Sequence, residues 1–185
     1  MAGRPRTFDR ESALILAMER FWRDGYEATT VSKLTAEMGI TPPSLYAAFG
    51  DKDQLFAAAA ECYFDAVTAA TARALEEPTA VGAVTRMLRS TAEAHTDPHT
   101  PPGCFMLTEP RLADRRALIR EQIAERLERG IAEGDLPASL SAGDTAGFLM
   151  AVMGGMSTRA RDGGSRAEVE AIAAAALAAL PPEAG

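Results

Sequence analysis

Apolar positions near the start of the chain recur at helical spacing and predict a first helix. Asp9 is suited to cap its N-terminus, the helix runs to about Asp24, and Gly25 ends it. Positions that recur every three or four residues form a stripe along one side of a helix, which faces the core. The inward positions are Leu14, Ala17, Met18 and Phe21, with Trp22 beside them.

Two shorter helices are predicted next, with a glycine between them. The Thr29-Thr30 pair offers an N-cap for a two-turn helix, and Gly39 ends this helix. Its inward positions are Val31, Leu34 and Met38. Thr41 then caps a third helix, in which Pro42 takes the first position. Proline is suited to that position because its missing N–H would have no partner inside the helix. The third helix is too short to be stable alone in water.

The remainder of the chain also has the pattern of helices, separated by turns that contain glycine or proline. Asp51 and Gln54 form a capping-box pattern ahead of a long helix that runs to about Leu75. No strand pattern and no internal repeat is present, so we expect an all-α fold of about nine helices. The later predicted helices cover residues 79–95, 104–112, 114–134, 141–160 and 165–180.

Composition and charge narrow the class of protein. The chain has 185 residues, 47% hydrophobic and 24% charged, and we expect a soluble, cytoplasmic, globular protein without a membrane span. The net charge of −7 argues against nonspecific coating of nucleic acid. Residues 1–56 hold seven Lys/Arg and eight Asp/Glu, whereas residues 57–185 hold twelve and eighteen. The acidity lies mostly in the second part, so any contact with DNA must be local.

The second and third helices form a helix-turn-helix pattern around Gly39. In this motif one helix crosses the DNA backbone and the next enters the major groove. Small side chains allow the third helix to approach base edges closely, and Pro43 and Ala47 can pack on thymine methyl groups. Tyr46 and Lys52 are suited to contact phosphates. The alternative is a tight corner in a helical bundle.

Three motifs between residues 21 and 56 match a known pattern. They are FWRDGYEATT from Phe21 to Thr30, LTAEMGIT from Leu34 to Thr41, and SLYAAFGDKDQLF from Ser44 to Phe56. This segment resembles the DNA-binding domain of the tetracycline-repressor (TetR) family of bacterial regulators. PPGCFM, EGDLPAS and GGMSTRARDGGSR, further along the chain, resemble one branch of the family. We therefore expect a helix-turn-helix DNA-binding domain over residues 1–54 and a ligand-binding and dimerisation domain over residues 55–185.

The resemblance implies a homodimer that binds a palindromic operator in double-stranded DNA, usually as a repressor. A small molecule, or an agent that modifies a thiol, would act on the C-terminal domain and release the DNA. Seven operator contacts follow from the resemblance: Thr30, Ser32, Thr41, Pro42, Ser44, Tyr46 and Lys52. Many relatives have a longer polar or basic side chain in place of Ser32, which puts base reading by the second helix in doubt. Arg4 and Arg6 resemble the N-terminal arm that reaches a minor groove, for which a disordered tail is the alternative.

The last two predicted helices are suited to dimerisation. Small residues allow two helices to approach closely, and larger apolar residues fill the seam between them, so two helices from each subunit would form a four-helix interface. The alternative is that the same faces belong to the ordinary core of one chain. The expected interface residues are Phe148, Val152, Gly155, Met156, Val169, Ile172, Ala176 and Leu180.

Two weaker signals concern metals and thiols. His95, Asp97 and His99 have side chains that suit a divalent cation, but His95 could equally close the preceding helix, and we expect no metal site. Cys104 begins a short helix whose dipole could lower a thiol pKa, which would suit a redox or electrophile sensor. The alternative is a buried apolar cysteine, and we expect Cys62 to be a core residue.

Two other classes of protein remain open on the residues alone. An all-α adaptor that binds only protein would fit the charge pattern. A small helical enzyme would need a nucleophile, a base and an orienting acid in one cleft. Both histidines lie in one loop and no glycine-rich phosphate loop is present, so we expect neither an enzyme nor a cofactor.

Overall fold

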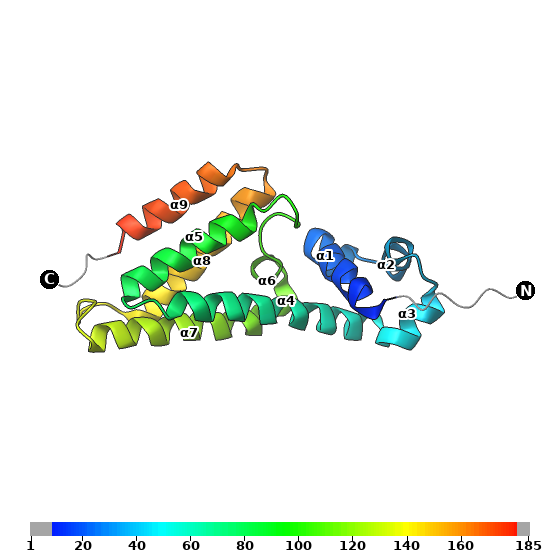
Figure 1. Cartoon of the computed structure of the whole chain (residues 1–185), viewed down its shortest axis with the longest axis horizontal. Coiled ribbons are helices and arrows are strands. Elements are labelled where there is room, and N and C mark those ends of the chain that lie inside the picture. The colour runs from blue at the N-terminus through cyan, green and yellow to red at the C-terminus, as the bar shows by residue number, and fades with distance from the viewer. Residues whose placement is uncertain (1–8, 181–185) are drawn as a thin grey trace, which may run out of the picture. The chain divides into compact units, whose positions relative to one another are not determined.

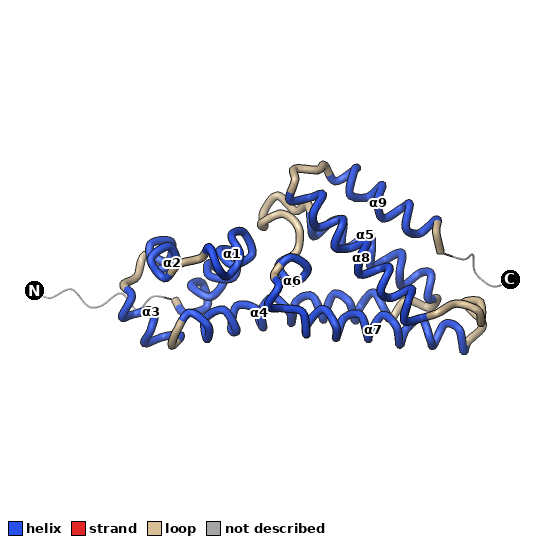
Figure 2. The backbone as a smooth tube through the Cα atoms, turned by 180° about the vertical axis from the view of Figure 1, so that it is seen from behind, coloured by secondary structure: helices blue, strands red, loops and turns tan. Residues whose placement is uncertain are grey.

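The computed structural model describes residues 9–180, whose regular structure is entirely helical (Figure 1). Nine α-helices, one 3-10 helix and no strand occur in these residues, which confirms the expected all-α fold (Figure 2). The elements are α1 (Arg10–Ala28), α2 (Val31–Met38), α3 (Pro42–Phe49), α4 (Lys52–Leu75), α5 (Ala80–His95), α6 (Phe105–Thr108), η1 (Pro110–Leu112), α7 (Ala113–Ala132), α8 (Ala142–Arg161) and α9 (Arg166–Ala178). Within the same residues, none of the helices combines the length and the apolar character that crossing a bilayer requires.

The chain divides into two units inside α4, with one unit ending at Tyr63 and the next beginning at Phe64. The boundary expected from the residues lay earlier in the same helix, between 54 and 55. Aromatic packing explains the later division. The Phe56 ring meets the Phe21 ring edge-on at 5.2 Å, and the Tyr63 ring meets the Trp22 ring edge-on at 5.0 Å. The first turns of α4 therefore belong to the core of the N-terminal unit.

Helix α1 begins where it was expected and continues beyond its expected end. The Asp9 carboxylate accepts a hydrogen bond from the Glu11 N–H at 3.1 Å and caps the helix. Gly25, with φ +77° and ψ 167°, breaks the helical path, and a further turn continues to Ala28. The buried stripe is rotated from the expected one, because Leu14 and Met18 are only half-buried. The buried side chains of α1 are Ala13, Ala17, Phe21 and Trp22.

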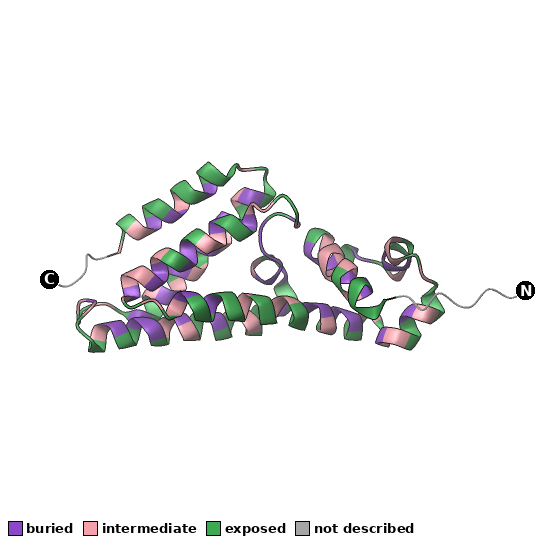
Figure 3. Cartoon of the chain, in the orientation of Figure 1, coloured by how far each residue is buried: buried purple, intermediate pink, exposed green. Residues whose placement is uncertain are grey.

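The C-terminal unit has a core of packed helices. Helix α8 packs against α7, α5 and α9, and α9 also packs against α5. Buried positions lie along these helices between exposed ones (Figure 3). The largest fully buried side chains of this unit are Val84, Leu88, Phe105, Ile123, Leu127, Leu149, Met156 and Val169. Ser165 and Glu168 form a capping box at the start of α9.

The short helix expected over residues 104–112 is two separate elements, so that prediction was wrong in detail. Glu109 has extended backbone angles, φ −87° and ψ 116°, and divides α6 from the 3-10 helix η1. Proline disfavours the helical conformation in the residue before it, and Pro110 follows Glu109 directly. The Glu109 side chain then accepts a hydrogen bond from the Arg111 N–H at 3.1 Å and caps η1.

The loop between α5 and α6 is held by two hydrogen bonds, one to the end of α5 and one to α8. The Gly103 N–H donates to the His95 carbonyl at 2.9 Å, and the Cys104 N–H donates to the Ser157 hydroxyl at 2.8 Å. Gly103 has φ +77°, and a Cβ there would lie 2.7 Å from Ser157 Oγ and 2.8 Å from Ser157 O. Only glycine meets both the conformation and the space at this position.

His95 lies inside this unit as a neutral side chain. It is buried, with 5% of its surface exposed, and Nδ1 has no hydrogen-bond partner among the described residues. Burial lowers the pKa of His95 to about 4, because the charged imidazolium would lose its hydration. His99, in the same loop, is exposed. The two histidines therefore have different environments.

We expect His95 to make folding pH-dependent. The unfolded chain binds a proton at His95 below about pH 6.5 while the folded chain resists it down to about pH 4, so stability falls as pH drops through this window. The contribution at pH 5 is about 2 kcal/mol smaller than at pH 7.5. Urea unfolding of the natural chain and of His95→Gln at both pH values measures it. The natural chain should lose more stability on acidification than His95→Gln, and His99→Gln should behave as the natural chain; equal losses in all three would contradict the prediction.

Candidate nucleic-acid interface

Helices α2 and α3 are joined by a short turn built on Gly39. Gly39 ends α2 in the left-handed conformation, with φ +66° and ψ 30°, and the Ile40 N–H donates to the Thr35 carbonyl at 3.1 Å. Thr41 has extended backbone angles and caps α3, accepting a hydrogen bond from the Ser44 N–H at 3.4 Å. Pro42 takes the first helical position, as expected. The local chemistry of the turn therefore produces the helix-turn-helix arrangement.

Helix α3 has one buried side and one exposed side. Leu45 and Phe49, with 0% and 7% of their surface exposed, are its buried residues and pack into the N-terminal unit. Tyr46 keeps 50% of its surface exposed, and the rest of the outer side is formed by small residues. The exposed residues of α3 are Pro42, Pro43, Tyr46 and Ala47, with Ser44 half-buried. Helix α3 thus presents a low, uncharged ridge.

The hydroxyl groups expected to contact DNA also have internal roles. Thr30 is exposed and caps α2, where its hydroxyl accepts from the Lys33 N–H at 3.2 Å. Thr41 Oγ1 and Ser44 Oγ lie 3.0 Å apart and share a hydrogen bond. Ser32 is exposed on the first turn of α2. Capping positions these hydroxyls on the helix termini that border the exposed side of α3.

Lys52 is held at the start of α4 by an aromatic ring. Its ammonium lies 3.9 Å from the centroid of the Tyr26 ring, a cation–π contact, and Lys52 remains half-buried. The Tyr26 hydroxyl donates to Asp53 at 2.7 Å. The Tyr26 ring also meets the Phe56 ring edge-on at 5.0 Å. Tyr26 therefore positions Lys52, a role that sequence reasoning missed although the residue lies in a quoted motif.

The capping box expected at the start of α4 is confirmed. The Gln54 N–H donates to the Asp51 carboxylate at 2.8 Å, and the Asp51 N–H donates to Gln54 Oε1 at 3.1 Å. Two N–H groups at this helix N-terminus are therefore bound by its own side chains. An anion approaching it would meet the Asp51 carboxylate, which leaves Lys52 as the group suited to a phosphate.

Arg10 is a second positioning residue that sequence reasoning missed. Its Nε donates to the Ala48 carbonyl at 3.3 Å, and its guanidinium carbon lies 4.8 Å from the centroid of the Phe49 ring. Arg10 thus connects the start of α1 to the last turn of α3. Only the three-dimensional contact reveals this role, because residues 10 and 48 are far apart in the sequence. The predicted DNA-contacting residues Arg4 and Arg6 lie outside the described residues.

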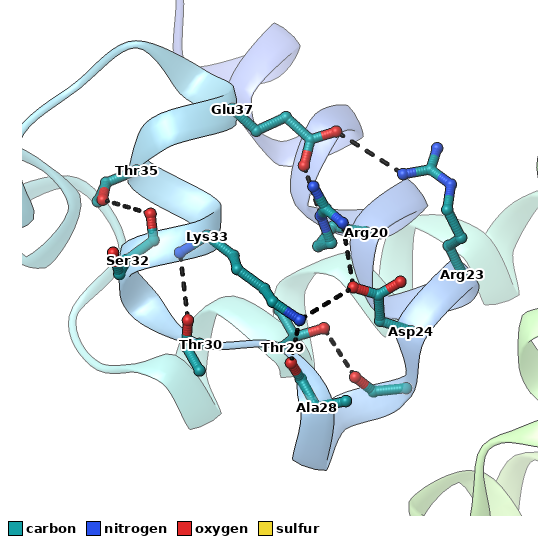
Figure 4. Close-up of polar contacts among 11 residues, drawn as sticks. Arg20, Arg23, Asp24, Ala28, Thr29, Thr30, Ser32, Lys33, Thr35 and Glu37 are labelled. Carbon is teal, nitrogen blue, oxygen red and sulfur yellow. Dashed lines mark hydrogen bonds and ion pairs between the residues drawn. The ribbon is translucent and has the colours of Figure 1, made fainter.

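An ion-pair network joins α1 to α2 (Figure 4). Arg20 donates to Glu37 at 2.6 Å and pairs with Asp24 at 3.0 Å, and the hydrogen bond to Glu37 raises the pKa of the Arg20 guanidinium. Lys33 donates to the Ala28 carbonyl at 2.9 Å and lies 3.6 Å from Asp24. Arg23 lies 3.8 Å from Glu37. In this network three cations share two carboxylates, and the contacts fix the orientation of α2 against α1.

The structure corrects part of the predicted dimer interface. Met156 and Val169 have no exposed surface and Ala176 has 4%, so these side chains belong to the core of the chain itself. Helices α8 and α9 pack on each other and on α5, which buries these three residues inside one chain. The other expected interface residues keep exposed or half-buried surface: Phe148, Val152, Gly155, Ile172 and Leu180.

The prediction for Cys62 was wrong, and the burial of Cys104 matches the alternative of a buried apolar cysteine. Cys62 was expected in the core and is exposed on α4, whereas Cys104 is buried with 4% of its surface exposed. Cys104 takes the N-cap position of α6, as expected, but α6 is a single turn of four residues.

Within residues 9–180 no three His, Cys, Asp or Glu side chains gather as a metal site would require. The His95, Asp97 and His99 set includes a buried imidazole and an exposed one.

These features are typical of a DNA-binding protein with a helix-turn-helix motif: the Gly39 turn, the exposed ridge of α3 and the positioned Lys52. Residues 14–59 match the family model described as "Bacterial regulatory proteins, tetR family". The chain is 33% identical to the HTH-type transcriptional repressor ComR of Escherichia coli, over 97% of this chain and 92% of ComR. The repressor BdcR of the same organism is 30% identical, over 96% of this chain and 92% of BdcR. The chain belongs to the TetR family of transcriptional regulators.

A solved structure agrees with this assignment over the full fold. A cysteine-substituted form of the TetR family regulator CifR, in complex with 26-base-pair operator DNA, has a TM-score of 0.91 and 36% identity. The match covers 97% of this chain and all of the CifR chain. A TetR regulator from Chloroflexus aurantiacus has a TM-score of 0.77 and 26% identity, over 91% of this chain and 92% of its own. Both units of the present chain are therefore shared with the family.

We expect the α1–α2 network to stabilise the N-terminal unit. Replacing Arg20 by Met keeps the apolar part of the side chain and removes the bonds to Glu37 and Asp24, so the free energy of unfolding should fall by about 1 kcal/mol. Denaturant unfolding at low and at high salt measures it, and the difference should shrink at high salt because ion pairs near the surface are screened. Arg73→Met, on an exposed arginine of α4, is the control. A loss that is unaffected by salt would indicate lost packing instead.

Proposed function

We propose that this TetR family protein is a repressor that inserts α3 into the major groove of an operator. The exposed ridge of α3 carries the proposal, because its small residues permit close approach while Leu45 and Phe49 hold the helix from behind. Tyr46 and Lys52 contact phosphates, and the ridge itself packs on base edges. The DNA-bound state of CifR and the repressor names of ComR and BdcR support this proposal. These relatives are regulators, which favours a regulatory role over an enzymatic one.

We further propose that α8 forms the centre of a homodimer interface. A Cβ built on Gly147, Gly154 or Gly155 meets nothing within 4 Å in the chain, so no neighbour within the chain requires glycine there. Glycine inside a helix costs about 1 kcal/mol relative to alanine. Close approach of a helix from a second subunit offers a reason for this cost.

Exposed apolar groups next to these glycines support the same surface. Phe148 on α8 keeps 42% of its surface exposed and Leu118 on α7 keeps 44%. Ala151 and Gly154 line a hollow of about 400 Å³ between α7 and α8. The proposed interface therefore uses α7 together with α8, and it places two reading units on one palindromic operator. A small-molecule effector acts on the C-terminal unit.

Two substitutions at the exposed side of α3 and the start of α4 test the DNA contact. Lys52→Ala should lower operator affinity about tenfold and reduce the slope of log K against log salt by about one, because one phosphate loses its cationic partner. Tyr46→Phe should weaken binding without changing that slope, since its hydroxyl is neutral. Titrations on a duplex selected by the protein from a random pool measure both. Arg73→Ala, at the far end of α4, is the control, and unchanged affinity in the first two variants would refute the groove model.

The dimer interface is tested by charge insertion. Phe148→Asp should convert the protein to a monomer, because a carboxylate would be buried against a partner without a counter-charge. Sedimentation velocity of the natural chain and the variant measures this. Ile15→Asp is the matched control, since Ile15 on α1 is equally exposed at 42% and lies outside the proposed surface. A Phe148→Asp chain that stays dimeric excludes this face as the interface.

A further inference from the structure

Arg126 is a buried cation with most of its hydrogen-bonding capacity unused. It lies on α7 with 2% of its surface exposed. Its Nη2 donates to the carbonyls of Glu77 and Pro78, both at 3.1 Å, in the turn after α4. Its Nε and Nη1 are buried, and neither has a hydrogen-bond partner in the described part of the chain. The two carbonyls account for one of the three guanidinium nitrogens.

An unmatched charge in this position is costly. Taking a cation out of water is strongly unfavourable unless an anion or a full set of hydrogen bonds replaces its hydration. Backbone carbonyls are neutral, so they supply hydrogen bonds without opposite charge. No carboxylate of residues 9–180 accepts from Nε or Nη1. The arrangement is one that an oxyanion would complete.

Arg126 lines a hollow between the last turns of α4 and the second half of α7. The hollow has a volume of about 390 Å³ and is lined by Ala72, Leu75, Glu76, Gln122, Glu125, Arg126 and Arg129. Gln122 lies one helical turn before Arg126, and its Oε1 is buried with no partner among the described residues. Arg126 and Gln122, the residues that carry these buried unpaired groups, therefore line the same hollow, and Ala72 and Leu75 add apolar surface to it.

The two acidic residues of the lining do not neutralise Arg126. Glu76 and Glu125 are both exposed to solvent, and neither forms an ion pair with Arg126. Arg129 is exposed as well, and its Nη2 donates to the Leu75 carbonyl at 3.2 Å. The charge that lacks compensation is therefore positive and belongs to Arg126. A carboxylate is favoured over a cationic ligand for this reason.

We propose that this hollow binds a small organic acid whose carboxylate pairs with Arg126 and whose short apolar part packs on Ala72 and Leu75. Gln122 Oε1 accepts a hydrogen bond from a donor on the ligand or from a water that accompanies it. Helix α4 begins at Lys52 and ends at this hollow, so occupancy acts on the helix that carries the phosphate contact. The regulatory part of the inference, that the acid weakens operator binding, rests on the proposed function.

Direct titration tests the site without DNA. Benzoate and octanoate are added to the full-length protein, and the Nε–H signal of the Arg126 side chain is followed by NMR. We expect a saturable shift with at least one of these acids and none with benzamide or octanamide, which have the same shape without the charge. Arg126→Gln should lower the affinity by about 30-fold and Gln122→Leu by about threefold to tenfold. Arg120→Gln, an exposed arginine on α7, should leave it unchanged.

The possible results separate the two proposals. If neither acid gives a saturable shift, or if Arg126→Gln and Gln122→Leu both bind as the natural chain does, the site is refuted whatever the DNA result. If Arg126→Gln does not fold, Gln122→Leu decides alone, since it leaves the carbonyl bonds of Arg126 intact. Loss of operator binding on adding the bound acid supports the effector role, and unchanged operator binding overturns it. A protein that binds the acid but no duplex refutes the proposed function and leaves the site standing.

Discussion

The exposed ridge of α3 depends on the burial of two side chains, Leu45 and Phe49. Helix α3 has eight residues, and a helix of that length is not stable alone in water. Burying its two large apolar groups in the N-terminal unit, and capping it with Thr41, holds the helix in place. Its other side is then free to consist of small residues. The exposed ridge is possible only because the opposite side supplies the stability.

The contacts around α3 extend this support to the neighbouring helices. Arg10 holds the last turn of α3 through Ala48 and Phe49, and Tyr26 holds Lys52 under a cation–π contact. The pairing of Arg20 and Glu37 fixes α2 against α1. Arg10, Tyr26, Arg20 and Glu37 therefore act by positioning other residues. A helix-turn-helix that reads DNA requires such rigidity, because base edges are recognised within hydrogen-bonding distance.

The C-terminal unit shows where sequence patterns were ambiguous. An apolar stripe on a helix predicts burial, yet it does not indicate whether the burying surface belongs to the same chain or to a partner. Met156 and Val169 were assigned to an interface and lie in the core of one chain, whereas Phe148 remains exposed. Cys62 was likewise expected in the core and is exposed. Arg126 and Gln122 gave no signal in the sequence, because only burial makes their unpaired groups significant.

The sequence by itself determined the local structure of this protein. Caps, glycine stops and proline positions act within a few residues, so the helices, the Gly39 turn and the capping boxes at Asp51 and Ser165 could be predicted from neighbours in the chain. The tertiary structure alone decided which face each helix buries and which distant residues meet. Those outcomes depend on packing between elements far apart in sequence, and periodicity within one helix carries no information about its partner.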